Sequence, residues 1–154
     1  YVSDVWHPDW AIKGHKRLAR GNCQGSTEES VARCVLAFDL IDDTSAPGPT
    51  HRRIDLSSRR ILFDLEKEMP NGADKTGYPD GLKCDANGNV YAGCGDGVRI
   101  YSPSGVFIGG IQMAGGVANL AFGGADGKTL LAFNETRAIA VQMNVSGALA
   151  PYSL

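Results

Sequence analysis

Short strand-like segments separated by tight turns recur along the second half of the chain, and this repeat restricts the fold more than any other feature. One run contains four such segments, namely Gly81–Asp85, Asn89–Cys94, Val98–Tyr101 and Val106–Ile108. The turns between the first three contain Asn-Gly and Asp-Gly pairs, whose residues readily accept the positive φ angles of hairpin turns. The run therefore predicts four antiparallel strands that follow one another in one sheet.

The pattern then begins again, with predicted strands at Val117–Phe122, Thr129–Phe133 and Ala138–Met143. Leu82 and Leu120 hold equivalent positions in the two runs. Four short strands in a repeat of about forty residues are typical of the blades of a β-propeller. The sequence thus predicts an all-β chain built from four-stranded antiparallel blades.

The first part of the chain fits the same pattern with gaps. A strand would end near Val2, two more would span Arg33–Leu40 and Arg59–Leu65, and a single helical turn is compatible with the residues that follow. A polar insertion over about residues 5–32 separates the first two of these strands. We expect about ten strands in groups of three, four and three. They would form a partial propeller over residues 1–146, followed by an unpaired tail over residues 147–154.

Composition excludes several other classes of protein. The 154 residues carry a formal net charge of −2, whereas a nucleic-acid-binding protein usually has a basic stripe. No apolar run approaches the ~18 residues that a membrane-spanning helix needs. Hydrophobic residues make up 43% of the chain, which is typical of a globular protein, and the 20 glycines suit a fold that is rich in turns. We therefore expect neither nucleic acid nor membrane as a partner.

Three phrases resemble one family of propellers. They are YPDGLKCDANGNVYAGCGDGVRIYSPSG, the later GGVANLAFGGADGKTLLAF, and YVSD followed after the insertion by VLAFDL. In order and spacing they resemble the gluconolactonase / regucalcin (senescence marker protein) family of six-bladed lactonases, most of all its fungal secreted branch. The resemblance implies that the chain corresponds to the C-terminal two and a half blades or so of such a propeller.

The resemblance also implies a metal site. In this family a Glu, an Asn and an Asp surround a divalent metal, and the Asp lies in a Pro-Asp-Gly phrase that matches Pro79-Asp80-Gly81. The other two ligands would precede Tyr1. Oxygen ligands suit a hard ion, so the expected cofactor is Ca²⁺ before other divalent metals. Asp80 would be a metal ligand and a catalytic general base, although Pro-Asp-Gly is also a common turn triplet in which the carboxylate only caps the turn.

Other polar side chains near this phrase have two interpretations each. Asn119 lies one blade later than Asp80 and could bind substrate or bond to neighbouring backbone. Tyr78 could pack on a sugar-like ring or anchor the loop. Asp85 and Asp96 each lie at a hairpin, where we expect them to stabilise the turn.

The four cysteines fall into two pairs. Cys23 and Cys34 flank the insertion, where a disulfide would constrain a loop without secondary structure, and we predict that bond. A two-residue Asn87-Gly88 turn would place Cys84 opposite Tyr91 and Cys94 opposite Gly81. The two sulfurs would then point to opposite faces of the sheet, so we expect no bond between them.

Two sequons favour an extracellular location. Asn134-Glu135-Thr136 and Asn144-Val145-Ser146 both lie near predicted strand ends, where a glycan would be exposed. Together with the predicted disulfide they indicate a secreted glycoprotein.

The leading functional hypothesis is metal-dependent hydrolysis of a small lactone. The expected partner is the N-terminal half of the same propeller, as a second chain or a cleaved segment, because an isolated set of blades leaves wide apolar faces open. Two alternatives stand beside it. One is a non-catalytic propeller that binds a sugar or a protein, and the other is a propeller enzyme of another class, either strictosidine-synthase-like or an esterase.

Overall fold

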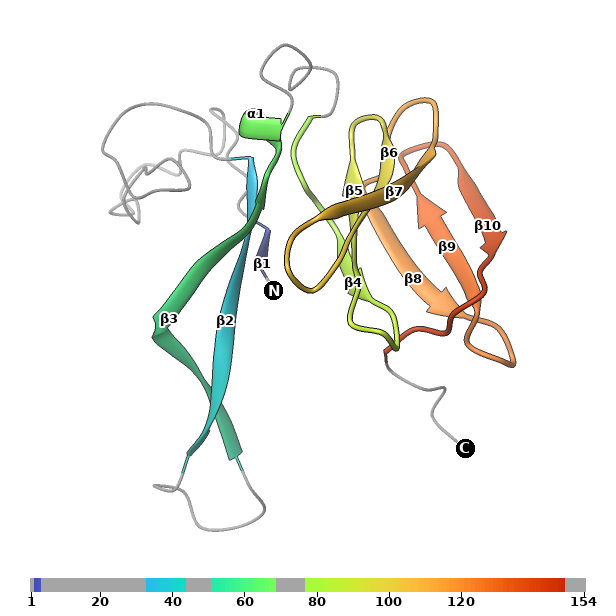
Figure 1. Ribbon diagram of the computed structural model, residues 1–154. Helices are drawn as coiled ribbons and strands as arrows, with labels where there is room; N and C mark the ends of the chain where they lie inside the picture. Colours follow the sequence, from blue (N-terminus) through green and yellow to red (C-terminus); the bar gives the residue numbers. More distant parts are fainter. Residues whose placement is uncertain (1, 4–32, 44–50, 69–76, 149–154) are drawn as a thin grey trace, which may run out of the picture.

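A computed structural model describes residues 2–3, 33–43, 51–68 and 77–148 of the chain. These residues form ten strands and one short helix, arranged in three antiparallel sheets of three, four and three strands (Figure 1). The described part of the chain has no helix with the length and apolar character needed to cross a membrane. The all-β class and the grouping of the strands agree with the sequence-based prediction.

The first sheet has the order β1-β2-β3. It consists of β1 (Val2–Ser3), β2 (Cys34–Asp43) and β3 (His51–Asp64). The single helical turn α1 (Leu65–Glu68) follows directly. The insertion expected over residues 5–32 lies outside the described residues.

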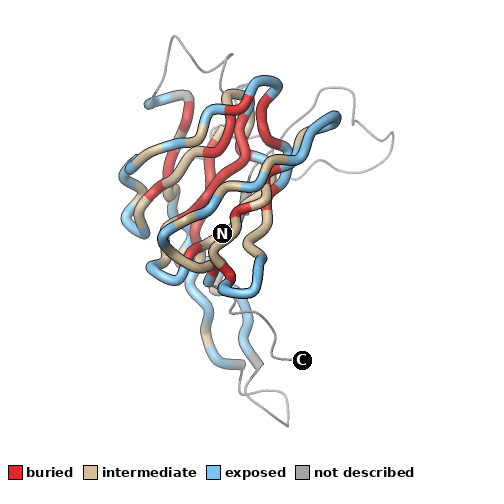
Figure 2. Tube along the Cα trace, turned by 90° about the vertical axis from the view of Figure 1, so that its right-hand side faces the viewer, coloured by how far each residue is buried: buried red, intermediate tan, exposed pale blue. Residues whose placement is uncertain are grey.

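The second sheet is a complete four-stranded blade. Its strands are β4 (Leu82–Cys84), β5 (Val90–Cys94), β6 (Gly97–Tyr101) and β7 (Phe107–Gln112), and they pair in sequence order. Every residue of β5 is buried, because neighbouring sheets cover both faces of this strand (Figure 2).

The third sheet repeats the first three strands of that blade. It contains β8 (Asn119–Gly123), β9 (Thr129–Phe133) and β10 (Ala138–Gln142), again paired in sequence order.

Two hydrophobic clusters join the three sheets face to face. One contains Val35 and Phe63 of the first sheet and Leu65 of α1 with Ala92 and Tyr101 of the second sheet. The other brings Tyr91 and Val98 of the second sheet together with Leu120 and Leu130 of the third. Leu82 packs on the first cluster and Leu120 lies in the second, so the two leucines do hold equivalent positions, each directed at the preceding sheet.

The hairpin between β4 and β5 has a different register from the one predicted. Gly88 N–H donates to the Asp85 carbonyl and Asp85 N–H donates to the Asn89 carbonyl, so three residues lie in the loop and Gly88 adopts a φ of 81°. Lys83 therefore pairs with Tyr91, and Cys84 pairs with Val90.

This register changes the reason why Cys84 and Cys94 do not bond. Both are free thiols, as predicted, but the shift by one residue places their side chains on the same face of the sheet rather than on opposite faces. Cys94 is four residues beyond the partner of Cys84, which is roughly 13 Å along the strand and far too distant for a disulfide. Distance, not facing direction, keeps the two sulfurs apart.

The hairpin of β2 and β3 is longer than predicted. Beyond the packed sheet it continues as a two-stranded ribbon in which Asp39–Asp43 pairs with His51–Asp55, after register shifts near Val35 and Ala37. In Figure 1 this ribbon projects away from the other two sheets. The ribbon was missed because its strands carry many charged residues, which match neither a buried strand nor a tight turn.

The segment after β10 also differs from the prediction of an unpaired tail. Gly147 forms an antiparallel bridge with Asp85, and Ala148 N–H donates to the Cys84 carbonyl at 2.9 Å. These bonds attach Gly147 and Ala148 to the edge of β4, while residues 149–154 lie outside the described part of the chain.

Candidate functional site

The candidate site lies where β4 and β8 begin side by side. Gly81 N–H donates to the Ala118 carbonyl at 2.9 Å, and Asp80 N–H donates to the Gly93 carbonyl at 2.8 Å. A Cβ atom on Gly81 would lie 2.7 Å from the Asn119 Cα, so only glycine allows the two strands to approach this closely. The arrangement brings Asp80 and Asn119, which sequence reasoning placed one blade apart, to the same edge of the molecule.

The Asp80 carboxylate faces solvent at this edge. Pro79 before it is buried and fixes the path of the chain, while Asp80 itself is exposed. Its side chain has no hydrogen-bond or ion-pair partner among the described residues. Partial desolvation by the surrounding protein raises the pKa of Asp80 above its ordinary value. A carboxylate of this kind is a stronger base than a free aspartate and is open to a ligand.

Asn119 is held in one orientation by its own backbone. Its side-chain Oδ1 accepts a hydrogen bond from Leu120 N–H at 2.8 Å. Because the oxygen is engaged, the amide offers its Nδ2 hydrogens to solvent, where the residue is exposed. The bond to neighbouring backbone is thus confirmed for the oxygen atom, while contact of the Nδ2 hydrogens with substrate stays a prediction.

Tyr78 is partly covered by a residue that sequence reasoning did not single out. The guanidinium of Arg33 lies 5.0 Å from the centre of the Tyr78 ring, which is a cation–π contact. One ring face is thus occupied by protein, which favours the role of a loop anchor, and substrate contact by Tyr78 stays a prediction. No sequence signal connects the two residues, because they are far apart in the chain and meet only through packing of the first two sheets.

Asp85 and Asp96 serve the turns, as predicted. Asp85 is buried at the far end of β4 from Asp80 and accepts hydrogen bonds from Asn87 N–H and Asn89 N–H, both at 2.9 Å. Asp96 forms a 2.6 Å ion pair with Arg99. Both carboxylates are committed to protein partners and do not contribute to the candidate site.

The described residues do not by themselves complete a metal site. No group of three or more His, Cys, Asp or Glu side chains suited to a metal occurs in residues 33–43, 51–68 and 77–148. Asp80 offers one carboxylate at the edge of β4 and β8, and the Asn119 Oδ1 beside it is already engaged. A calcium ion requires six to eight oxygen ligands. Any divalent metal here would therefore need ligands beyond these residues.

The predicted disulfide falls partly outside the described residues. Cys34 is buried in β2 and is not one of the free thiols. Cys23 lies in a segment that the structure does not describe, so its pairing with Cys34 stays a prediction.

The two sequons lie in contrasting settings. Asn134 Nδ2 donates to the carbonyls of Ala114 and Gly116 at 3.4 and 3.3 Å, and its Oδ1 accepts from Arg137 N–H at 2.8 Å. Asn144 is exposed just after β10. Glycosylation at Asn134 would compete with hydrogen bonds that shape the β9–β10 loop, whereas a glycan on Asn144 would displace none of the hydrogen bonds described.

Comparison with known proteins identifies the family. The family model described as the SMP-30/Gluconolactonase/LRE-like region matches residues 26–132, which is more than half of the chain. The chain belongs to this family. The resemblance seen in the sequence is thus confirmed at the level of the family, while the fungal secreted branch stays a prediction.

Two solved structures are similar to the chain. One is assigned as a gluconolactonase and is 30% identical, with 70% of this chain and 36% of that chain covered and a TM-score of 0.49. The other is a luciferin-regenerating enzyme, 22% identical, with 77% of this chain and 41% of that chain covered and a TM-score of 0.57. The second likeness supports the propeller fold. No curated protein sequence matches the chain.

The chain spans well under half the length of either solved relative. The family makes a lactonase-type propeller the expected setting for the described blades.

Proposed function

We propose that these blades supply Asp80 and Asn119 to a site that hydrolyses a lactone. The observation that carries the proposal is the exposed Asp80 carboxylate, which has a raised pKa and no partner among the described residues, beside an amide that is oriented to donate. Membership of the SMP-30/Gluconolactonase/LRE-like family supports this type of reaction.

The chemistry requires a base and a donor to oxygen. In lactone hydrolysis a water molecule attacks the carbonyl carbon, the ring C–O bond breaks, and a hydroxy acid forms. Asp80 would accept the proton of the attacking water and return it to the ring oxygen as that oxygen leaves. Asn119 Nδ2 would donate to the carbonyl oxygen, whose negative charge increases in the transition state.

A divalent metal would add charge stabilisation at the same oxygen. We propose that Asp80 is one of its ligands, with calcium as the first candidate, and that the remaining ligands come from the rest of the propeller packed against these blades. This part of the proposal predicts that a chelator abolishes hydrolysis and that added Ca²⁺ restores it.

The central experiment compares lactone hydrolysis by the wild-type protein with hydrolysis by Asp80→Ala and Asp80→Asn. We expect both variants to lose at least about a hundredfold in kcat, which is the lower range for removal of a general base. Asp126→Asn is the matched control. Asp126 is an exposed turn carboxylate, and it accepts hydrogen bonds from Lys128 N–H and Gln142 Nε2. Equal activity of Asp80→Asn and wild type would refute the site. Sugar or protein binding without hydrolysis would instead favour the non-catalytic alternative.

The raised pKa of Asp80 gives this site a pH signature. The ionised form is the active base, so kcat/KM should fall as the pH drops through the pKa of Asp80, which desolvation raises and which a bound cation would lower. The free energy of unfolding should change with pH in the opposite direction. It should rise as the pH drops, because desolvation disfavours the ionised form of Asp80 in the folded state. Asp80→Asn should therefore keep or slightly raise the melting temperature at pH 7. A clear loss of stability in that variant would mark Asp80 as a structural residue.

A further inference from the structure

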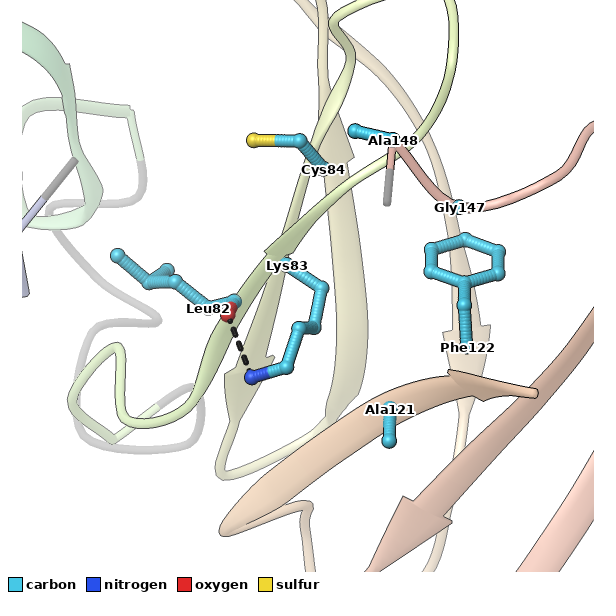
Figure 3. A pocket seen from close by; sticks show the side chains of 7 residues that line it. All are labelled: Leu82, Lys83, Cys84, Ala121, Phe122, Gly147 and Ala148. Carbon is cyan, nitrogen blue, oxygen red and sulfur yellow. Dashed lines mark hydrogen bonds between the residues drawn. The ribbon is translucent and has the colours of Figure 1, made fainter. Parts of the chain in front are cut away.

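A pocket lies between β4 and β8, further along the chain from Asp80 and Asn119. Leu82 follows Asp80 by two residues on β4, and Ala121 follows Asn119 by two residues on β8, so both line the pocket roughly 7 Å further along the strands. Figure 3 shows the side chain of Lys83 between these two strands, with Ala121 and Phe122 on the β8 side, while the side chains of Leu82 and Cys84 leave β4 on its other side.

The segment after β10 closes the far end of the pocket. Gly147 N–H donates to the Gly127 carbonyl at 3.0 Å, and Ala148 N–H donates to the Cys84 carbonyl at 2.9 Å. A Cβ atom on Gly147 would lie 2.5 Å from the Phe122 Cβ, so this segment sits directly against the pocket wall (Figure 3). The floor is therefore fixed by backbone bonds rather than by loose side chains.

The lining is mostly hydrocarbon. Ala121, Phe122 and Ala148 present apolar side chains, Leu82 lines the pocket beside its own packing against the first sheet, and burial raises the pKa of the Cys84 thiol, which keeps it neutral. Lys83 is the only charged residue of the lining, and its Nζ donates to the Leu82 carbonyl at 2.9 Å. This bond engages one of the three N–H donors of the ammonium group. The pocket thus has few groups that could recognise several hydroxyls.

The pocket is large enough for an aliphatic group of several carbons. Its volume is about 370 Å³, which is at the lower end of the range for small-molecule sites. A lactone ring held between Asp80 and Asn119 would direct a substituent of several carbons into it, whereas a polyhydroxylated ring would leave its hydroxyls against hydrocarbon and lose hydrogen bonds to water.

We infer that the pocket formed by Leu82, Cys84, Ala121, Phe122, Gly147 and Ala148 binds the aliphatic substituent of a lactone. The preferred substrate is an alkyl-substituted lactone rather than a sugar lactone. This inference rests on the proposed function, since it assigns the substrate class of the same site.

The test separates binding from hydrolysis. Binding of δ-lactams with methyl, propyl and pentyl substituents, which keep the ring but resist hydrolysis, is measured by calorimetry. Each buried methylene contributes about 0.8 kcal/mol, so affinity should rise about fourfold per carbon until the pocket is full. The matching δ-lactones and a polyhydroxylated aldono-δ-lactone are then compared by kcat/KM.

Two variants fill the pocket and one serves as a control. Ala121→Phe should abolish the dependence of lactam affinity on the length of the alkyl substituent, and so should Ala148→Phe at an exposed position. Ala125→Phe, in the exposed β8–β9 turn, should keep this dependence. Melting curves establish that each variant is folded. If Ala121→Phe disturbs β8, Ala148→Phe still provides the test.

Each outcome addresses one claim. Affinity that does not change with chain length, or a kcat/KM that favours the aldonolactone, overturns the inference and leaves the lactonase proposal in place. Chain-length-dependent binding of the lactams without hydrolysis of any lactone confirms the pocket and overturns the proposed reaction.

Discussion

At the scale of single residues, Asp85 is the only charged side chain that is buried among the described residues, with 1% of its surface exposed. Sequence reasoning placed it in a turn, which is correct, but nothing in the Asp-x-Asn-Gly phrase indicates burial. The carboxylate is enclosed because Tyr91 O–H donates to it at 3.2 Å and the Ser146–Gly147 segment covers the hairpin. That segment is distant in the sequence, so only the tertiary structure reveals its role.

Asp85→Ala should destabilise the fold by about 3 kcal/mol, because it removes a buried carboxylate that accepts several hydrogen bonds. The Asn87 and Asn89 amides and the Tyr91 hydroxyl donate those bonds. Urea unfolding followed by fluorescence measures the change. Asp126→Ala, at the exposed turn of the next hairpin, should cost less than about 1 kcal/mol. Equal losses in the two variants would contradict the role given to Asp85.

The two sequons give a second prediction at this scale. If the protein is secreted, as we propose, Asn144 should carry a glycan at high occupancy and Asn134 at low occupancy, because the Asn134 amide already bonds to two carbonyls. Mass spectrometry of glycosidase-treated peptides from the native host measures both sites. Higher occupancy at Asn134 than at Asn144 would show that the β9–β10 loop does not hold its observed shape.

At the scale of elements, the ribbon formed by the outer parts of β2 and β3 stands apart from the packed blades. Its apolar side chains Leu40, Ile54 and Leu56 are 58%, 48% and 76% exposed. Ion pairs between Asp39 and Arg60 and between Asp42 and Arg52 lie at 2.8 and 3.5 Å, but both are exposed and contribute little stability. The ribbon is therefore stabilised mainly by the backbone hydrogen bonds between β2 and β3.

Leu56→Ser should leave the free energy of unfolding within about 0.5 kcal/mol of wild type, since the side chain has almost no packing to lose. It should also raise the concentration at which the protein aggregates, because an exposed apolar group is removed. Leu120→Ser is the contrasting variant, with 1% exposure, and should unfold the third sheet. Light scattering and urea titration provide the two readouts. A large loss of stability in Leu56→Ser would mean that the ribbon packs against a partner surface.

At the scale of the whole molecule, the repeat read from the sequence correctly predicted ten strands and their division among three sheets. Strong turn signals and alternating apolar residues are local, and they suffice for strands and blades. The site was predicted only in part. Asp80 could be singled out by its phrase, but its closeness to Asn119 depends on the approach of β4 to β8, and the contact of Arg33 with Tyr78 depends on sheet packing. Contacts between blades join residues that are far apart in the chain, so they cannot be predicted from a single sequence.

The cluster that joins the first and second sheets contains one stacked aromatic pair. Phe63 stacks on Tyr101 with ring centres 3.6 Å apart, and both side chains are buried. Phe63→Ala should lower the free energy of unfolding by about 3–5 kcal/mol. The first sheet should then unfold in a separate transition at a lower temperature than the other two. Calorimetry should then show two peaks, while Phe133→Ala, at a half-exposed position of β9, should keep one. A single transition in Phe63→Ala would indicate that the sheets unfold as one unit.

The bridge between Gly147 and Asp85 has a consequence for how the protein is made. The β4–β5 hairpin leaves the ribosome long before the segment that covers its buried carboxylate. During that interval the edge of β4 is open and Asp85 is in contact with water, so the hairpin must wait for a late, long-range contact to reach its final state. Chains interrupted before Ser146 would keep that edge unpaired, and an unpaired strand edge is a site for association with other chains. Synthesis of the segment around Ser146 and Gly147 is thus the event that closes the inner edge of the second blade.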